Sequence, residues 1–182
     1  MGLISEIKSF LVHLIINWPC TKLGYKMRES FYRRHLKSSG SNLSIASGVI
    51  FGDPVSIEIG NYCKFGRNVN IGAGECNGIY IGSYVSIADG TYFRSGNHKF
   101  DSTDIPIQHQ GHYSSEIQFN NEKYSVVIED DVWIGARAII LSGTHIGKGS
   151  IVGAGTVVSS KIPPYSIVMG NPGRVISKRK VK

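Results

Sequence analysis

Cysteine and long apolar runs are scarce in this 182-residue chain, and each scarcity excludes a class of protein. The three cysteines, Cys20, Cys63 and Cys76, show no CxxC spacing, which argues against a disulfide framework and against a zinc ribbon. We therefore expect a reducing, cytoplasmic location. The apolar stretch 10–16 is interrupted by His13, is far shorter than a transmembrane span and is followed by no small-residue cleavage site.

Acidic residues are few at both ends of the chain. Residues 1–40 carry seven Lys and Arg against two acids, and residues 170–182 carry five basic residues and no acid, so the stretch between them is net −3, eight basic minus eleven acidic. A nucleic-acid groove would need basic and aromatic residues interleaved along one face, and we expect no nucleic-acid partner. The basic ends favour phosphate-bearing ligands or an anionic surface, with solvated tails as the alternative.

From residue 45 onward, an aliphatic or aromatic residue recurs every six positions, a period that belongs neither to helices nor to ordinary hairpins. Two aliphatic triplets eighteen residues apart show the repeat: Ile128, Ile134 and Ile140, then Ile146, Val152 and Val158. Three hexapeptides therefore close one triangular coil, and the next coil stacks on it. We expect a mainly β protein, a parallel β-helix over residues 42–177 whose recurring aliphatic side chains fill a narrow prism.

Glycine is abundant, with 22 residues, and it recurs after the aliphatic positions: Gly60, Gly66, Gly72, Gly82, Gly135, Gly147 and Gly153. At these corners a side chain would crowd the neighbouring coil. The hexad breaks between Phe93 and Val126, where polar residues without period predict a protruding loop at 99–125. A loop of that length in a compact fold is usually functional.

The N-terminal segment predicts two helices. Apolar residues recur at helical spacing over 3–17 and Pro19 ends that pattern, while a second helix is expected over 22–37. We assign residues 1–41 to a cap, because the terminal edge of a stacked core has to be covered. The alternative is peripheral association of this basic segment with the inner face of a membrane. Residues 178–182 form a basic C-terminal tail.

Two strings carry a family resemblance: the repeat VWIGARAIILSGTHIGKGSIVGAGTVV at 132–158 and the closing motif IPPYSIVMGNPGRVI at 162–176. Over about residues 42–177 the chain resembles the hexapeptide-repeat acetyltransferases, which include maltose, galactoside, serine and xenobiotic acetyltransferases. The resemblance implies a left-handed parallel β-helix, acetyl-CoA as acyl donor and a homotrimer with active sites between neighbouring prisms. The segment SGNHKFDSTDIPI at 95–107 is most similar to enzymes that acetylate polysaccharide sugars or antibiotics.

His98 is the expected catalytic residue. It is the sixth residue of the hexad that begins at Phe93, a prism corner just before the loop, and the resembling enzymes place their catalytic histidine at this step. Transfer to a hydroxyl needs a base that takes its proton as the oxygen attacks the thioester carbon, and imidazole titrates in the right range. His145 lies at the equivalent corner one coil later and Cys76 one coil earlier, which predicts a ladder of the three side chains.

For the donor, the resemblance assigns the pantetheine groove to residues beside which a cofactor can lie close: Trp133, Gly135, Ala136, Gly153 and Ala154. Many relatives have serine at position 136, so an oxyanion hole here would depend on the backbone N–H of Ala136. The phosphates of CoA are assigned to Arg174 and Lys161, although relatives often have Thr-Lys where this chain has Ser160-Lys161.

The acceptor is expected to contact polar residues of the coil before His98 and of the loop: Asn70, Glu75, Asn77 and Asp101. His109 and His112 also lie in the loop, but their spacing does not reproduce the zinc-binding histidines of related β-helical carbonic anhydrases, so no metal is expected. A sugar or polysaccharide precursor is the first candidate acceptor, and an antibiotic or the amine of a nucleotide sugar is the alternative. A non-catalytic scaffold is a further alternative, against which the intact base and donor motifs argue.

Overall fold

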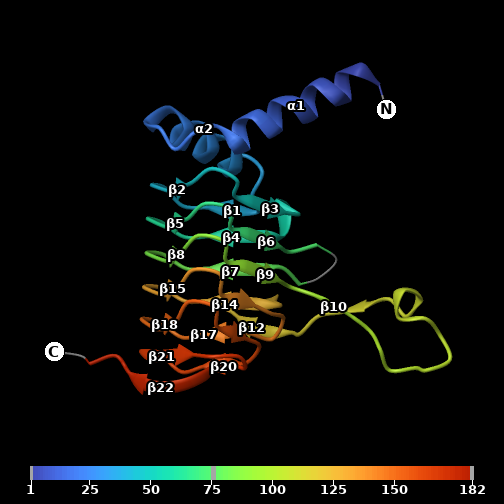
Figure 1. Ribbon diagram of the computed structural model, residues 1–182, viewed down its shortest axis with the longest axis vertical. Coiled ribbons are helices and arrows are strands. Elements are labelled where there is room, and N and C mark those ends of the chain that lie inside the picture. Colours follow the sequence, from blue (N-terminus) through green and yellow to red (C-terminus); the bar gives the residue numbers. More distant parts are fainter. Residues whose placement is uncertain (1, 75–76, 181–182) are drawn as a thin grey trace.

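The computed structural model describes residues 2–74 and 77–180 and is a parallel β-solenoid of about six turns with two helices at one end (Figure 1). The chain winds through three sheets, called A, B and C here, and the bends between them are the AB, BC and CA corners. Within the described residues, sheet A contains β1 (Ser38–Ser39), β4 (Ile57–Ile59), β7 (Ile79–Ile81), β14 (Val126–Ile128), β17 (His145–Ile146) and β20 (Lys161–Ile162).

Sheet B contains β2 (Ser44–Ile45), β5 (Lys64–Phe65), β8 (Ser86–Ile87), β15 (Trp133–Ile134), β18 (Ile151–Val152), β21 (Ser166–Met169) and the antiparallel β22 (Arg174–Lys178). Sheet C contains β3 (Ile50–Gly52), β6 (Asn70–Gly72), β9 (Tyr92–Arg94), β16 (Ile139–Ile140) and β19 (Val157–Val158). The coils stack because the backbone N–H and C=O groups of each strand form hydrogen bonds with strands of the coils above and below it, about 4.8 Å away.

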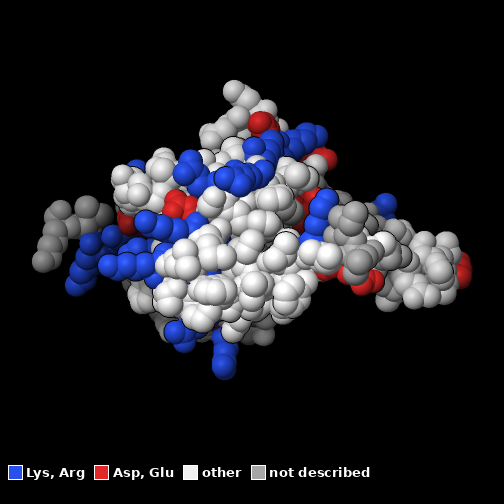
Figure 2. Space-filling view, turned by 90° about the horizontal axis from the view of Figure 1, so that it is seen from above, with Lys and Arg blue, Asp and Glu red and all other residues white. Residues whose placement is uncertain are grey.

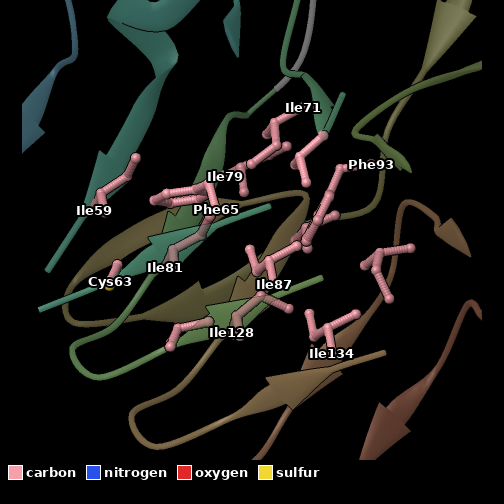
Figure 3. Packing of buried hydrophobic residues seen from close by; sticks show 14 of the residues in the cluster. Ile59, Cys63, Phe65, Ile71, Ile79, Ile81, Ile87, Phe93, Ile128 and Ile134 are labelled. Atoms are coloured by element: carbon pink, nitrogen blue, oxygen red, sulfur yellow. The ribbon is translucent and has the colours of Figure 1, made fainter. Parts of the chain in front are cut away.

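The predicted aliphatic triplets are confirmed as core. Ile128 pairs with Ile146 in sheet A, and the other members of the two triplets pair in the same way in sheets B and C. Figure 3 shows such side chains from successive coils filling the interior of the prism. Cys63 lies among them, and burial raises the pKa of its thiol to about 11, so this cysteine is a core residue.

The glycine prediction holds at most corners and is wrong at one. A Cβ atom on Gly135 would lie 2.6 Å from the backbone nitrogen of Ala154, which no side chain tolerates. On Gly72 the nearest atom to such a Cβ would be 3.5 Å away, an ordinary van der Waals distance. Gly72 is the last residue of β6, where the chain enters a CA corner, and the atoms nearest to such a Cβ are the carbonyl oxygen of Phe93 and Nη1 of Arg94.

The two helices, α1 (Leu3–Asn17) and α2 (Lys22–Arg33), behave differently. α2 covers the first coil: the buried Arg28 side chain donates from Nε to the carbonyl oxygen of Ile45 at 2.7 Å and from Nη1 to that of Trp18 at 2.6 Å. The cap prediction therefore holds for α2, which ends at Arg33 rather than 37 because the chain turns there into β1. No helix in the described part of the chain combines the length and the apolar character needed to cross a membrane.

Between β9 and β14 the chain leaves the prism at a CA corner as an arm, residues 95–125 (Figure 1). Its elements are β10 (Asn97–His98), the 3-10 turn η2 (Ile107–His109), β11 (His112–Tyr113), β12 (Ile117–Phe119) and β13 (Glu122–Tyr124). The β10–β11 part projects, as the sequence predicts for the loop. The β12–β13 hairpin folds back on sheet A, where the rings of Phe119 and Tyr124 lie 5.0 and 5.6 Å from that of Tyr80.

Candidate active site

His98 lies on the projecting part of the arm, with its side chain exposed. β10 and β11 pair antiparallel, so His98 is opposite His112, and the two imidazole centroids are 4.4 Å apart at an interplanar angle of 42°. A base for acyl transfer has to reach a hydroxyl that arrives from solution. The arm therefore presents an accessible imidazole beside a second one.

The predicted ladder of His98 and His145 is wrong. Val127 of β14, and not His98, pairs with His145, because the chain leaves the prism before it reaches that position in the third coil. His145 Nε2 lies 2.7 Å from Glu129 Oε1, and Glu129 Oε2 accepts the backbone N–H of Lys148 at 2.9 Å. The half-buried His145 thus takes part in a contact between coils. Cys76 lies outside the described residues.

The base of the arm is held by residues of the CA corners before and after it. The Asn77 side chain donates from Nδ2 to Ser114 Oγ at 3.4 Å and to the carbonyl oxygen of Ser115 at 3.3 Å. From the other side, Ser142 Oγ accepts the backbone N–H of Ser115 at 2.9 Å. Asn77, expected to touch the acceptor, therefore engages the segment between β11 and β12. Asp101 is exposed on the arm, Asn70 is half-buried on sheet C, and Glu75 lies outside the described residues.

The BC corner carries the small residues predicted for the donor. At several other corners a side chain of the next coil caps the equivalent N–H group, as Asp89 Oδ1 accepts from Arg67 N at 2.8 Å and Asp130 Oδ1 from Ser83 N at 2.7 Å. At Ala136 the residue one coil later is Ala154, which has no such acceptor. The Ala136 N–H makes no hydrogen bond to another residue of the described ranges. This corner therefore offers an uncapped donor beside the side-chain-free surface of Gly135.

The two residues assigned to CoA phosphates lie on different sheets. Arg174 is exposed on β22 and pairs with Met169, whose side chain approaches Gly153 at the BC corner. Lys161 is on β20 of sheet A and pairs with His145. Within one chain, the structure brings Arg174 but not Lys161 to the small-residue corner.

Trp133 stands on sheet B, 54% exposed, at the edge of a cavity of about 420 Å³. The cavity is lined by Tyr84, Ser86, Asp131, Val132, Trp133, Ile151 and Arg179. Arg179 Nη1 donates to Asp131 Oδ2 at 2.9 Å and closes one side of it. The hexad pattern identifies inward-facing residues only, so it provides no reason to single out Tyr84 or Asp131.

Across residues 2–74 and 77–180, no three His, Cys, Asp or Glu side chains gather in a group that could hold a metal ion.

Known proteins match this chain over its repeat and beyond. Residues 125–160 match the family described as bacterial transferase hexapeptide (six repeats). A galactoside O-acetyltransferase of Escherichia coli K12 is 32% identical over 151 residues, which is 82% of this chain and 67% of that protein. The chain belongs to the hexapeptide-repeat acetyltransferase family.

Other members of the family are named for different substrates. A chloramphenicol acetyltransferase of Klebsiella aerogenes is 36% identical over 108 residues, 56% of this chain and 51% of that protein. One solved structure is a hexapeptide-repeat acetyltransferase of Vibrio cholerae O1 biovar eltor complexed with acetyl-coenzyme A. The match covers all of this chain and 93% of that protein's chain, with a TM-score of 0.76 and 26% identity. The chain spans about half to two thirds of the length of the curated relatives it matches.

Proposed function

We propose that this protein transfers the acetyl group of acetyl-CoA to a hydroxyl of a sugar or polysaccharide precursor, with His98 as general base. The observation that carries the proposal is the exposed imidazole of His98 on an arm whose base is fixed by Asn77 and Ser142. A galactoside O-acetyltransferase among the relatives supports a saccharide acceptor.

The reaction needs two proton transfers, one from the acceptor hydroxyl to the base and one from the base to the leaving thiolate. His98 takes the proton of the acceptor hydroxyl as its oxygen attacks the thioester carbon of acetyl-CoA. The negative charge on the carbonyl oxygen is stabilised by the uncapped N–H of Ala136. The carbon–sulfur bond then breaks, and the imidazolium returns the proton to the departing thiolate. No acetyl-enzyme forms in this scheme.

The donor lies along the BC corner, where the small residues Gly135, Ala136, Gly153 and Ala154 place no long side chain in the path of its pantetheine chain. Trp133 borders it on sheet B, and Arg174 at the end of the corner binds phosphate. Lys161 serves the donor of a neighbouring chain, since it lies on another sheet of its own prism. The V. cholerae relative, which was solved with acetyl-CoA, supports this donor.

The active unit is a homotrimer with sites between prisms. In one chain the arm leaves at the CA corner and the uncapped N–H lies at the BC corner, so sheet C separates them. Sheet C also exposes an apolar column: Ile50, Tyr92 and Ile139 are 46%, 38% and 36% exposed and are aligned through Asn70. Burial of this column against a neighbour would bring a second prism's corner to the arm. Light scattering should then give about three times 19.9 kDa.

The test is release of free thiol from acetyl-CoA with a panel of acceptors: oligosaccharides, amino sugars and chloramphenicol. Turnover with saccharides and none with the other two classes supports the proposal. Turnover with chloramphenicol alone would make the protein a xenobiotic acetyltransferase, and turnover with amino sugars alone an N-acetyltransferase. Acetyl-CoA, but not acetate, should also raise the melting temperature, because it binds the native state; the absence of any shift would support the scaffold alternative.

A further inference from the structure

The helix α1 carries an apolar face that the fold leaves uncovered. Ile7, Phe10, Leu11 and Leu14 are spaced i, i+3, i+4 and i+7, so they share one side of the helix. They are 50%, 65%, 50% and 41% exposed. The sequence predicts a cap over residues 1–41 as a whole, but α2 covers the first coil, and α1 uses Ile16 on another side to pack against the core.

Unpaired basic side chains lie at the same end of the molecule. Lys26, Arg33 and Arg34 of the α2 region are exposed, line a cavity of about 490 Å³ and make no ion pair within the described part of the chain. Lys37 also lines this cavity but is neutralised by Glu58 at 2.8 Å and by Glu122. Figure 2 looks onto this end and shows Lys and Arg side chains beside a broad uncharged area.

We propose that the α1–α2 end docks on the surface of an anionic phospholipid bilayer. The apolar face of α1 enters the interface between head groups and acyl chains, and Lys26, Arg33 and Arg34 contact lipid phosphates. A second copy of this chain fits the surface less well, because joining two identical ends would bring two sets of like charges together. Docking at this end leaves the arm, which departs two coils further on, free in solution (Figure 1).

The experiment is co-sedimentation of the full chain with phosphatidylcholine vesicles, with and without phosphatidylglycerol. We expect binding to the anionic vesicles only, weakened by salt. Phe10→Glu should weaken it at least about tenfold. The matched control is Phe100→Glu, since Phe100 is 67% exposed but lies on the arm, and this variant should bind as the wild type does.

A second part of the experiment tests the charges with a variant that combines Lys26→Ala, Arg33→Ala and Arg34→Ala. Each removed basic side chain should weaken binding to anionic vesicles about fivefold. Removal of Lys64, Lys99 and Lys148, which are exposed elsewhere, is the control with the same net charge.

Three outcomes would overturn the proposal: no binding to anionic vesicles, equal losses in the variant and control of either pair, or a change in particle mass of Phe10→Glu without vesicles. The last result would make a second copy the occupant of α1. If Phe10→Glu does not fold, Leu11→Ser tests the same face. Vesicle binding needs no acetyl-CoA, so this result is independent of the proposed function.

Discussion

The AB and BC corners of the prism repeat one bend from coil to coil, whereas the CA corner differs on nearly every coil. In the repeated bends, one residue has a left-handed backbone and donates its N–H to the coil before it. Tyr84 (φ 61°) donates to Asn61 at 2.8 Å at the AB corner, and Gly90 (φ 70°) donates to Arg67 at 2.8 Å at the BC corner. A left-handed tyrosine costs about 1–2 kcal/mol, so the bend is kept although the side chain opposes it.

The spacing of buried residues shows the same contrast. The chain advances six residues between successive buried residues at the AB and BC corners, as from Ile128 to Ile134 and from Ile134 to Ile140. At successive CA corners the differences in residue number are eight, ten, thirty-five, six and four: Phe51 to Ile59, Ile71 to Ile81, Phe93 to Ile128, Ile140 to Ile146 and Val158 to Ile162. Insertions in a repeat protein that gather on one edge often mark its binding face. The regular corners therefore support the fold, and the irregular corner carries the candidate base.

The largest effect should come from the irregular corner. We expect His98→Ala to lower kcat by about 10²–10⁴-fold, because the hydroxyl loses its general base. The melting temperature and the affinity for acetyl-CoA should stay near wild type, since the His98 side chain is exposed and lies outside the prism. Steady-state kinetics with the acceptor found in the thiol-release screen, together with a binding titration, measures both.

Cys76→Ala is the control for this variant, because the sequence predicts a structural and not a catalytic role for Cys76. It should keep most of the activity. Near-full turnover in His98→Ala, or loss of turnover in a folded Cys76→Ala protein, would contradict the assignment of the base.

A substitution at a regular corner should lower the stability of the fold, which His98→Ala should leave unchanged. Gly135→Ala places a Cβ 2.6 Å from the backbone nitrogen of Ala154, and such overpacking costs about 1–3 kcal/mol. The melting temperature should fall by several degrees, about 2–4 °C for each kcal/mol in a chain of this size. Gly72→Ala is the matched control, and an equal fall in both variants would refute the difference between the corners.

Loss of the hydrogen bonds that hold the base of the arm should have a smaller effect. Asn77→Asp keeps the shape of the side chain but removes the Nδ2 donor to Ser114 and Ser115. The loss should amount to about 0.5–1.5 kcal/mol, seen as weaker amide protection in the arm and a higher KM for the acceptor. Asn42→Asp, at an exposed AB corner, should leave both unchanged. A rise in KM without any change in arm protection would instead mean that Asn77 contacts the acceptor.

The smallest effect concerns the ion-pair cluster that joins the β12–β13 hairpin to the first coils. Hydrogen bonds to Glu122 and Glu58 raise the pKa of Lys37 above its ordinary 10.5. Burial is the largest influence on Glu58 and raises its pKa, but hydrogen bonds from Lys37, Tyr124 and Ser38 outweigh it and hold the pKa below its ordinary 4.5. Both groups are therefore charged and stabilising at neutral pH.

Lys37→Met should remove less than about 1 kcal/mol at neutral pH, because Lys37 and Glu122 are 41% and 50% exposed. The contribution of Glu58 is present above pH 4.5 and lost as the pH falls through its lowered pKa; that of Lys37 is present below pH 10.5 and lost as the pH rises through its raised pKa. Urea melts across this range measure the difference. Lys123→Met, at the more exposed pair with Glu116, should show a smaller one.

The sequence predicted what a strict period can encode. Ile128 and Ile146 are found in register because every bend between them obeys the hexad. The position of His98 relative to His145 was wrong because the arm interrupts the period between Phe93 and Val126, and no repeat sets its path. The helical spacing of apolar residues in α1 was recognised, but periodicity indicates a face and not its partner, so the exposure of Leu11 could not be foreseen.

The arm also gives the prism an unequal order of assembly. In sheet A, Ile128 pairs with Ile146, eighteen residues away, and with Ile81, forty-seven residues away, the differences of those numbers. Closing the longer loop costs about 0.8 kcal/mol more in chain entropy, and folding slows as contacts become less local. The coils after the arm should therefore form before they join the coils preceding it, and pulse-labelling hydrogen exchange should protect β14–β19 ahead of the pairing between β7 and β14. The arm that carries the candidate base thus also separates two halves of the solenoid, and we expect the pairing between these halves to form last.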